Sequence, residues 1–169
     1  MHENGSADCR QARRLLESAA GPDHPDVAKV LNTLGSLCED RGDDAEAEQL
    51  YQRSVQIMAK TRGDAALQRI RVQSLSHLAG VYRVQGRYRQ AEALYRRALA
   101  TAEKTFGRHD LEVATLLNNL AVLYKYTASF SEAGRLYLRA LAITMKVLGP
   151  EHAEVARRSF SGQTISTWP

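Results

Sequence analysis

The chain has 169 residues and a mass of 18.8 kDa, and 44% of its residues are hydrophobic and 25% charged. With 11 glycines, 4 prolines and 2 cysteines it is not collagen-like, disulfide-scaffolded or wholly disordered. Lys and Arg (23) exceed Asp and Glu (19), and the resulting net charge of +4 suits acidic partners without requiring them.

No apolar stretch in residues 1–30 resembles a signal peptide, and no window approaches the roughly 18 consecutive apolar residues that cross a bilayer. We therefore expect a cytoplasmic protein without a membrane segment. Cys9 and Cys38 have neither CxxC spacing nor paired histidines, so the sequence predicts no redox motif or metal site. Cys38 is expected to be a small buried core residue.

Three segments of the chain repeat one pattern of apolar and small residues. Residues 74–107 match residues 116–149 at 13 of 34 positions, and this similarity indicates a shared architecture. Strings that begin at Leu31, Leu75 and Leu117 are each followed by a tyrosine, and the steps between these tyrosines are 44 and 42 residues. The tyrosines are Tyr51, Tyr95 and Tyr137, and Gly63, Gly107 and Gly149 close the units at matching offsets.

Within each repeat the apolar residues recur at helical intervals, which predicts two amphipathic helices per repeat. Turn residues separate the two helices at 41–43 and 85–87, whereas the third turn, at 126–129, contains no glycine. Glycine, proline and acidic residues at 21–27 and 149–155 mark joints between repeats. In chain order we predict a flexible N-terminus at 1–9, the second helix of a preceding repeat at 10–20, repeats at 25–63, 67–107 and 110–149, the start of a further helix at 151–160, and a flexible tail at 161–169.

Small residues at equivalent positions allow the two helices of a repeat to approach closely. Gly35, Ala79 and Ala121 take this position in the first helices, and Ala47, Ala91 and Ala133 take the facing one. The large residues, including the three tyrosines, are then expected to wedge between neighbouring hairpins. These features predict an all-α protein built from antiparallel helix hairpins.

The pattern resembles the tetratricopeptide repeat, which has Leu, Leu, Gly/Ala and Tyr in its first helix and Ala, Tyr and Ala in its second. The first repeat departs from this signature at Cys38 and Ser54. The 42-residue step and the Leu-Asn-Asn-Leu-Ala-Val-Leu-Tyr string are similar to the kinesin-light-chain form. The resemblance implies a right-handed α-solenoid, the tetratricopeptide superhelix, whose first helices line a concave groove. The matching residues are Leu75, Leu78, Ala79, Tyr82, Ala91, Tyr95 and Ala98 in the second repeat and Leu117, Leu120, Ala121, Tyr124, Ala133, Tyr137 and Ala140 in the third.

The outward stripe of the first helices is the candidate binding site. Asn and Ser both donate and accept hydrogen bonds, so a row of them suits the main chain of an extended peptide. The resemblance implies peptide contacts at Asn118 and Asn119 and, less directly, at Asn32; the alternative is that these asparagines are solvated or brace the neighbouring hairpin. The predicted groove residues are Asn32, Ser76, His77, Arg83, Asn118, Asn119, Val122 and Lys125.

Three arginines, Arg53, Arg97 and Arg139, recur at one position of the second helices, near the groove edge. They are candidates for attracting a carboxylate-bearing peptide. The alternative is that each arginine pairs with an acidic side chain of the helix surface or is solvated.

The sequence favours a non-enzymatic scaffold that binds a protein or acidic peptide in its groove. It contains no GxSxG, phosphate loop or HExxH, and we expect no catalytic residue, cofactor or metal. One alternative is a module of a longer array that forms homo-oligomers through its exposed ends. A weaker alternative is nucleic-acid contact through the arginine-rich segment 83–97, for which a solvated helix face is the simpler interpretation.

Overall fold

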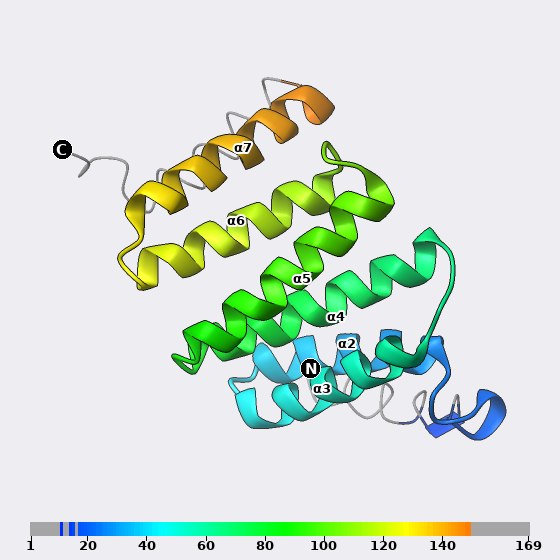
Figure 1. Cartoon of the computed structure of the whole chain (residues 1–169). Helices are drawn as coiled ribbons and strands as arrows, with labels where there is room; N and C mark the ends of the chain where they lie inside the picture. The colour runs from blue at the N-terminus through cyan, green and yellow to red at the C-terminus, as the bar shows by residue number, and fades with distance from the viewer. Residues whose placement is uncertain (1–10, 12–13, 16, 150–169) are drawn as a thin grey trace. The chain divides into compact units, whose positions relative to one another are not determined.

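A computed structural model of the chain describes residues 11, 14, 15 and 17–149. The described residues form helices and no strand, which confirms the prediction of an all-α protein. Residues 17–20 are helical, and six helices follow: α2 (Pro25–Glu39), α3 (Asp44–Lys60), α4 (Ala65–Val84), α5 (Tyr88–Phe106), α6 (Leu111–Tyr126) and α7 (Phe130–Leu148) (Figure 1). The predicted segments 1–9, 151–160 and 161–169 lie outside the described residues.

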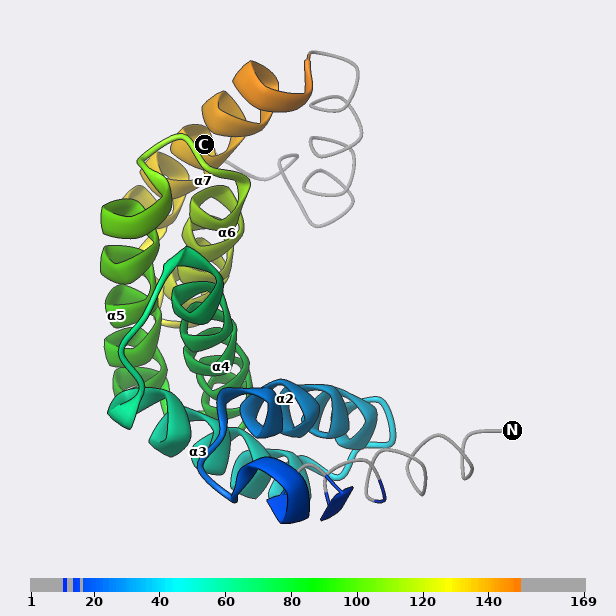
Figure 2. The same cartoon turned by 90° about the vertical axis from the view of Figure 1, so that its right-hand side faces the viewer.

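The chain divides into two compact units, residues 1–101 and 102–169. In the first unit α2 packs against α3, and both helices pack against α4 (Figures 1 and 2). Tyr51 and Tyr95 are only 0% and 3% exposed, so both tyrosines belong to the core as expected. A Cβ on Gly35 would lie 2.5 Å from the ring of Tyr51, and the missing side chain therefore leaves the space that this ring fills.

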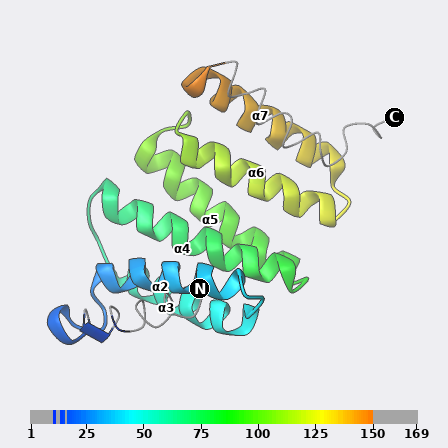
Figure 3. The same ribbon diagram turned by 180° about the vertical axis from the view of Figure 1, so that it is seen from behind.

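In the second unit α6 and α7 lie side by side as a hairpin (Figures 1 and 3). The contact surface of α6 is apolar, with Leu116, Leu117 and Leu120 all buried. Ala121 of α6 and Ala133 of α7 are fully buried, as their role as small contact residues requires. Tyr137 is half-buried.

The turns between the two helices of each repeat share one backbone conformation. Gly42 and Gly86 have φ values of 76° and 75°, in the left-handed region that glycine adopts without steric penalty. Ala128 takes the equivalent place in the third turn with φ of 56°. The third turn therefore forms without the glycine that marks the other two.

The junction between α3 and α4 differs from the other joints. Gly21, Gly107 and Gly149 all have positive φ, whereas Gly63, which we expected to close its repeat in the same way, does not. The reason is that α4 starts early, at Ala65, and Arg71 then reaches back to the end of α3. Its Nε and Nη2 donate to the carbonyl oxygen of Met58 at 3.1 and 2.5 Å, and Nη2 also donates to the carbonyl oxygen of Thr61. These bonds satisfy carbonyl groups that a left-handed glycine motif would otherwise satisfy.

Within the described part of the chain, no helix has the length and apolar character that a membrane span requires.

Candidate functional site

Four equivalent positions on α4 and α6 share the same partial exposure. Ser76, His77, Gly80 and Arg83 of α4 are half-buried, and so are their counterparts on α6. The residues beside them, such as Leu78 and Leu120, are 5% and 3% exposed and belong to the core. We call the half-exposed residues of each unit its polar stripe: Ser76, His77, Gly80 and Arg83 in the first unit, and Asn118, Asn119, Val122 and Lys125 in the second.

Asn32 of α2 has the same repeat position as Ser76 and Asn118 but serves the fold. It is 8% exposed, and its Nδ2 donates a 3.0 Å hydrogen bond to Oγ of Ser74 on α4. The hydroxyls of Ser74 and Ser54 lie 2.7 Å apart, and Ser54 also donates to the carbonyl oxygen of Ala28. This buried network joins α2, α3 and α4, so Asn32 braces the neighbouring hairpin, which was the alternative to peptide contact.

Asn118 and Asn119 differ from each other in the second unit. The Oδ1 atom of Asn118 is buried and has no hydrogen-bond partner among the described residues, as is also true of Oδ1 of Asn32. In the first unit Asn32, at this repeat position, contacts α4, which is the first helix of the next repeat. The segment that would follow α7 in the same way, residues 151–160, lies outside the described residues. The position of Asn118 therefore fits a brace as well as a peptide contact, whereas Asn119 occupies the repeat position of His77.

The core tyrosines reach the first helices through their hydroxyl groups. Tyr51 donates a 2.5 Å hydrogen bond to Oε2 of Glu39 on α2. In the next repeat the direction is reversed: Arg83 donates to the hydroxyl oxygen of Tyr95, and its positive charge opposes the rise that burial causes in the pKa of this tyrosine. Glu39, Arg83 and Lys125 occupy one repeat position, so the charge at this position is negative in the first repeat and positive in the other two. The twelve-residue spacing from Glu39 to Tyr51 and from Arg83 to Tyr95 was the sequence signal for this contact, and sequence reasoning missed it.

His77 is held between these groups in the first unit. Its ring stacks on Tyr51 with 4.9 Å between centroids and an interplanar angle of 6°. Burial lowers the pKa of His77, and the nearby carboxylate of Glu39 only partly opposes this effect. His77 therefore presents a neutral imidazole to the stripe at neutral pH.

Two of the three recurring arginines on the second helices already have acidic partners. Nη2 of Arg53 donates to Oδ1 of Asp23 at 2.8 Å and to the carbonyl oxygen of Pro22 at 3.2 Å. Arg139 donates to Oε1 of Glu103. Arg97 is exposed on α5. The alternative of pairing with acidic side chains thus describes Arg53 and Arg139.

Two members of the arginine-rich segment 83–97 are also paired. Arg87 donates to Glu48 at 2.7 Å, and its guanidinium carbon lies 3.7 Å from the ring centroid of Tyr82. Arg96 donates to Glu92 at 2.9 Å. These pairs reduce the positive charge that the segment offers to phosphate groups.

The described residues contain no group of three or more His, Cys, Asp or Glu side chains that could hold a metal ion. Cys38 is 7% exposed, as expected of a core residue. Burial, together with Glu46, raises the pKa of its thiol to about 11, which keeps the thiol protonated at neutral pH.

The family model described as tetratricopeptide repeat matches residues 1–60 and 71–146. This match covers most of the chain, and the chain therefore belongs to the tetratricopeptide-repeat family, with the all-α solenoid fold. Its repeats resemble the kinesin-light-chain form, as the sequence predicts. Repeats of this family generally mediate protein–protein interaction and are typically non-enzymatic.

The crystal structure of BtubC (BKLC) from P. vanneervenii is similar, with a TM-score of 0.69 and 27% identity over 88% of this chain and 57% of that one. The chain thus spans 57% of that protein's length. Two crystal structures of Podosopora anserina putative kinesin light chain repeats, one of them a variant, cover 88% and 86% of this chain and 89% and 88% of theirs, at 18% and 19% identity and TM-scores of 0.46 and 0.44. No curated protein sequence gives a significant match.

Proposed function

We propose that the chain is a non-catalytic scaffold that binds an extended peptide segment of a partner protein along the polar stripe of its second unit, with an equivalent stripe in the first. The observation that carries the proposal is the shared half-exposure of four equivalent positions on α4 and α6, next to buried core residues such as Leu78 and Leu120. A half-exposed row of donors and acceptors offers main-chain partners to a peptide without demanding one sequence. The predicted cytoplasmic location fits this role and stays a prediction.

The charge along the first helices favours an acidic peptide at the second and third repeats. Arg83 and Lys125 are positive at the position where the first repeat has Glu39. Hydrogen bonds between charged groups are stronger than neutral ones, so carboxylates of the peptide add affinity at these two positions. Glu39 repels such carboxylates in the first repeat.

A displayed library of random peptides would test the proposal. Peptides selected on the full chain are measured by fluorescence anisotropy against the wild type and the Asn119→Ala, Lys125→Ala double variant. We expect about tenfold weaker binding by the variant, with an unchanged melting temperature. The matched control is Arg135→Ala, which removes one exposed charge from α7. Equal affinities of the wild type and the double variant would reject the proposal.

A second candidate, self-association, is favoured by the apolar surface of α7. Leu138, Met145 and Leu148 are 69%, 46% and 43% exposed and lie on one face of the helix by their spacing. Exposed apolar residues grouped in this way are typical of interaction surfaces. Light scattering over a concentration series should detect dimers that Leu138→Glu abolishes and that Val84→Glu, at an exposed residue of α4, does not. A wild-type chain that stays monomeric at the highest concentration excludes this candidate.

A further inference from the structure

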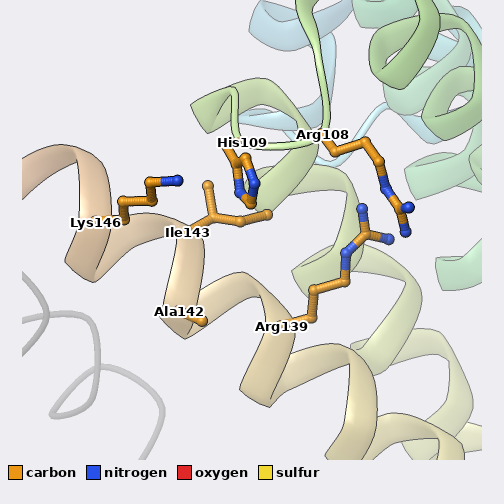
Figure 4. Close-up of a pocket in the computed structure, with 6 residues that line it drawn as sticks. All are labelled: Arg108, His109, Arg139, Ala142, Ile143 and Lys146. Atoms are coloured by element: carbon orange, nitrogen blue, oxygen red, sulfur yellow. The ribbon is translucent and has the colours of Figure 1, made fainter.

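An open pocket of about 330 Å³ lies where the loop before α6 meets the C-terminal half of α7. It is lined by Arg108 and His109 from the loop and by Arg139, Ala142, Ile143 and Lys146 from α7 (Figure 4). The pocket is built from the joint of the repeat and from its second helix, so it is separate from the polar stripe on the first helices.

The pocket gathers positive charge. Figure 4 shows the guanidinium groups of Arg108 and Arg139 turned toward each other, with Lys146 on the other side of His109. Arg139 donates to Glu103, whereas no carboxylate among the described residues pairs with Arg108 or Lys146. Cations that lie close together without enough acid to balance them favour an anion in the space between them.

The equivalent residues of the first repeat show which chemical group such a pair of cations binds. Asp23, Arg53 and Lys60 occupy the repeat positions of His109, Arg139 and Lys146, each pair 86 residues apart. In the first repeat, Oδ1 of Asp23 accepts from Arg53 at 2.8 Å and Oδ2 accepts from Lys60 at 2.9 Å. The hydrogen bond from Lys60, with help from Arg53, lowers the pKa of Asp23, which means that the two cations stabilise a carboxylate there.

The third repeat keeps the cations and loses this acid. Glu103, the partner of Arg139, corresponds to Glu17, and each lies in the helix that precedes its joint, so a glutamate is present at that position before both the first and the third repeat. The difference lies at the joint, where His109 replaces Asp23 and Arg108 replaces Pro22. At the position of Asp23 a carboxylate has been exchanged for a histidine, and one further cation has been added. The acid at the next position, Asp110 in place of His24, accepts a 2.8 Å hydrogen bond from the backbone N–H of Glu112 at the start of α6.

We propose that this pocket binds the side-chain carboxylate of an aspartate or glutamate in a partner peptide, which takes the place that Asp23 fills in the first repeat. Lys146 and Arg139 hold the carboxylate as Lys60 and Arg53 hold Asp23, and Arg108 supplies a third donor. A carboxylate is favoured over a phosphate because a carboxylate is the group that the equivalent residues bind within this chain. The site does not depend on peptide binding at the polar stripe.

The substitution that restores the internal acid provides the test. A fluorescein-labelled peptide of four glutamates, acetylated and amidated at its ends, is titrated with the full chain at low ionic strength and followed by anisotropy. His109→Asp, which supplies a carboxylate from the chain itself, should weaken binding about tenfold or more, because the pocket's cations are then neutralised from within. It should also raise the melting temperature, a change that shows the variant is folded.

Two variants serve as controls. Arg135→Gln removes a positive charge from the same helix outside the pocket and should leave the affinity within about twofold, since exposed charges interact weakly. Because Lys125 also attracts carboxylates, the Asn119→Ala, Lys125→Ala variant should lose only the binding at the stripe and keep the tetraglutamate binding that His109→Asp removes. If that variant loses binding while His109→Asp keeps it, the stripe and not the pocket is the site, and the proposal made here fails.

The reciprocal substitution tests the derivation from the first repeat. Asp23→His removes the internal acid there and should create a second binding event. This event should be weaker, because Pro22, at the repeat position of Arg108, offers no side-chain donor. No binding by the wild type, equal binding by His109→Asp, or no second event in Asp23→His would each overturn the proposal. The pocket would be reassigned to phosphate if the chain bound a ten-residue thymidine oligonucleotide more tightly than the tetraglutamate peptide and if His109→Asp abolished that binding.

Discussion

Asn32 and Ser74 connect the first helices of two consecutive repeats through one buried hydrogen bond of 3.0 Å. Ser74 also donates to the carbonyl oxygen of Ile70 and contacts the hydroxyl of Ser54. The pair therefore belongs to a polar network inside an otherwise apolar interface. Buried polar groups of this kind hold a structure together only while each has its partner.

Ser74→Ala removes the centre of this network. Asn32 Nδ2 is then left buried without an acceptor, and we expect the free energy of unfolding to fall by about 1–3 kcal/mol. Urea denaturation of the full chain measures the change. Thr33→Ala, at the exposed neighbour of Asn32, is the control and should alter stability by less than about 0.5 kcal/mol. A Ser74→Ala variant as stable as the wild type would show that the network contributes nothing.

Gly35→Ala and Gly134→Ala should have opposite effects. A methyl group on Gly35 would lie 2.5 Å from the Tyr51 ring, so the ring must move, at a cost of about 1–3 kcal/mol. A Cβ on Gly134 of α7 meets no atom within 4 Å, and alanine there should stabilise the helix by up to about 1 kcal/mol. Thermal denaturation should move the two midpoints in opposite directions, and a shift of the same sign in both would contradict this explanation.

Arg71→Ala tests the junction between α3 and α4. The carbonyl groups of Met58 and Thr61 lose a charged donor, and we expect stability to fall by about 1.5–3 kcal/mol. Arg71→Lys should restore part of the loss because an ammonium donates without the planar fork of arginine. Arg89→Ala, at an exposed arginine of α5, controls for the lost charge. Equal losses in Arg71→Ala and Arg89→Ala would rule out the capping role.

Ala128→Gly should stabilise the third turn. Alanine at φ of 56° bears a steric cost of roughly 1–2 kcal/mol that glycine avoids, while glycine gains entropy in the unfolded chain. We expect a net gain of up to about 1 kcal/mol in chemical denaturation. Gly86→Ala makes the reverse exchange at the equivalent position and should destabilise the chain. A loss of stability in Ala128→Gly would mean that the turn does not hold this residue in the left-handed region.

Stability should also depend on pH through His77. Burial lowers the folded-state pKa of His77 below its ordinary value of 6.5, so the unfolded chain takes up a proton at a higher pH than the folded chain does. The contribution of neutral His77 is therefore present above about pH 6.5 and is lost as the pH falls below it. Melting temperatures at pH 7.5 and 5.5 should differ less in His77→Phe than in the wild type. A His77→Phe variant with the full wild-type difference would contradict the assignment.

The sequence was sufficient for the helices and for the core tyrosines. Apolar spacing identifies which face of a helix is buried, and the equivalent positions of Tyr51 and Tyr95 placed both side chains in the core, where they lie. The turn at 126–129 followed from its place in the repeat although it contains no glycine.

Individual polar partners could not be predicted from the sequence. Helical periodicity gives the face on which Asn32 lies but not the residue that it meets, and Ser74 has Val30 and Leu116 as its counterparts in the other repeats. The Asn32–Ser74 pair is therefore not repeated in the sequence and could not be recognised by comparing the repeats. Arg71 is missed for a similar reason, since a long side chain that reaches back to another helix leaves no trace in a pattern of apolar residues. The role of Asp23 depends on two cations from a different helix, 30 and 37 residues further along the chain.

The shared placement of Asp23 and His109 also bears on how such arrays diversify. Aspartate and histidine codons differ only in their first base, so one nucleotide change at the joint of a duplicated unit swaps the two residues while the helices around them stay as they are. A gene that grows by duplicating hairpins can in this way convert an internal ion pair into a binding contact for another molecule. The reverse substitution needs only one base change as well.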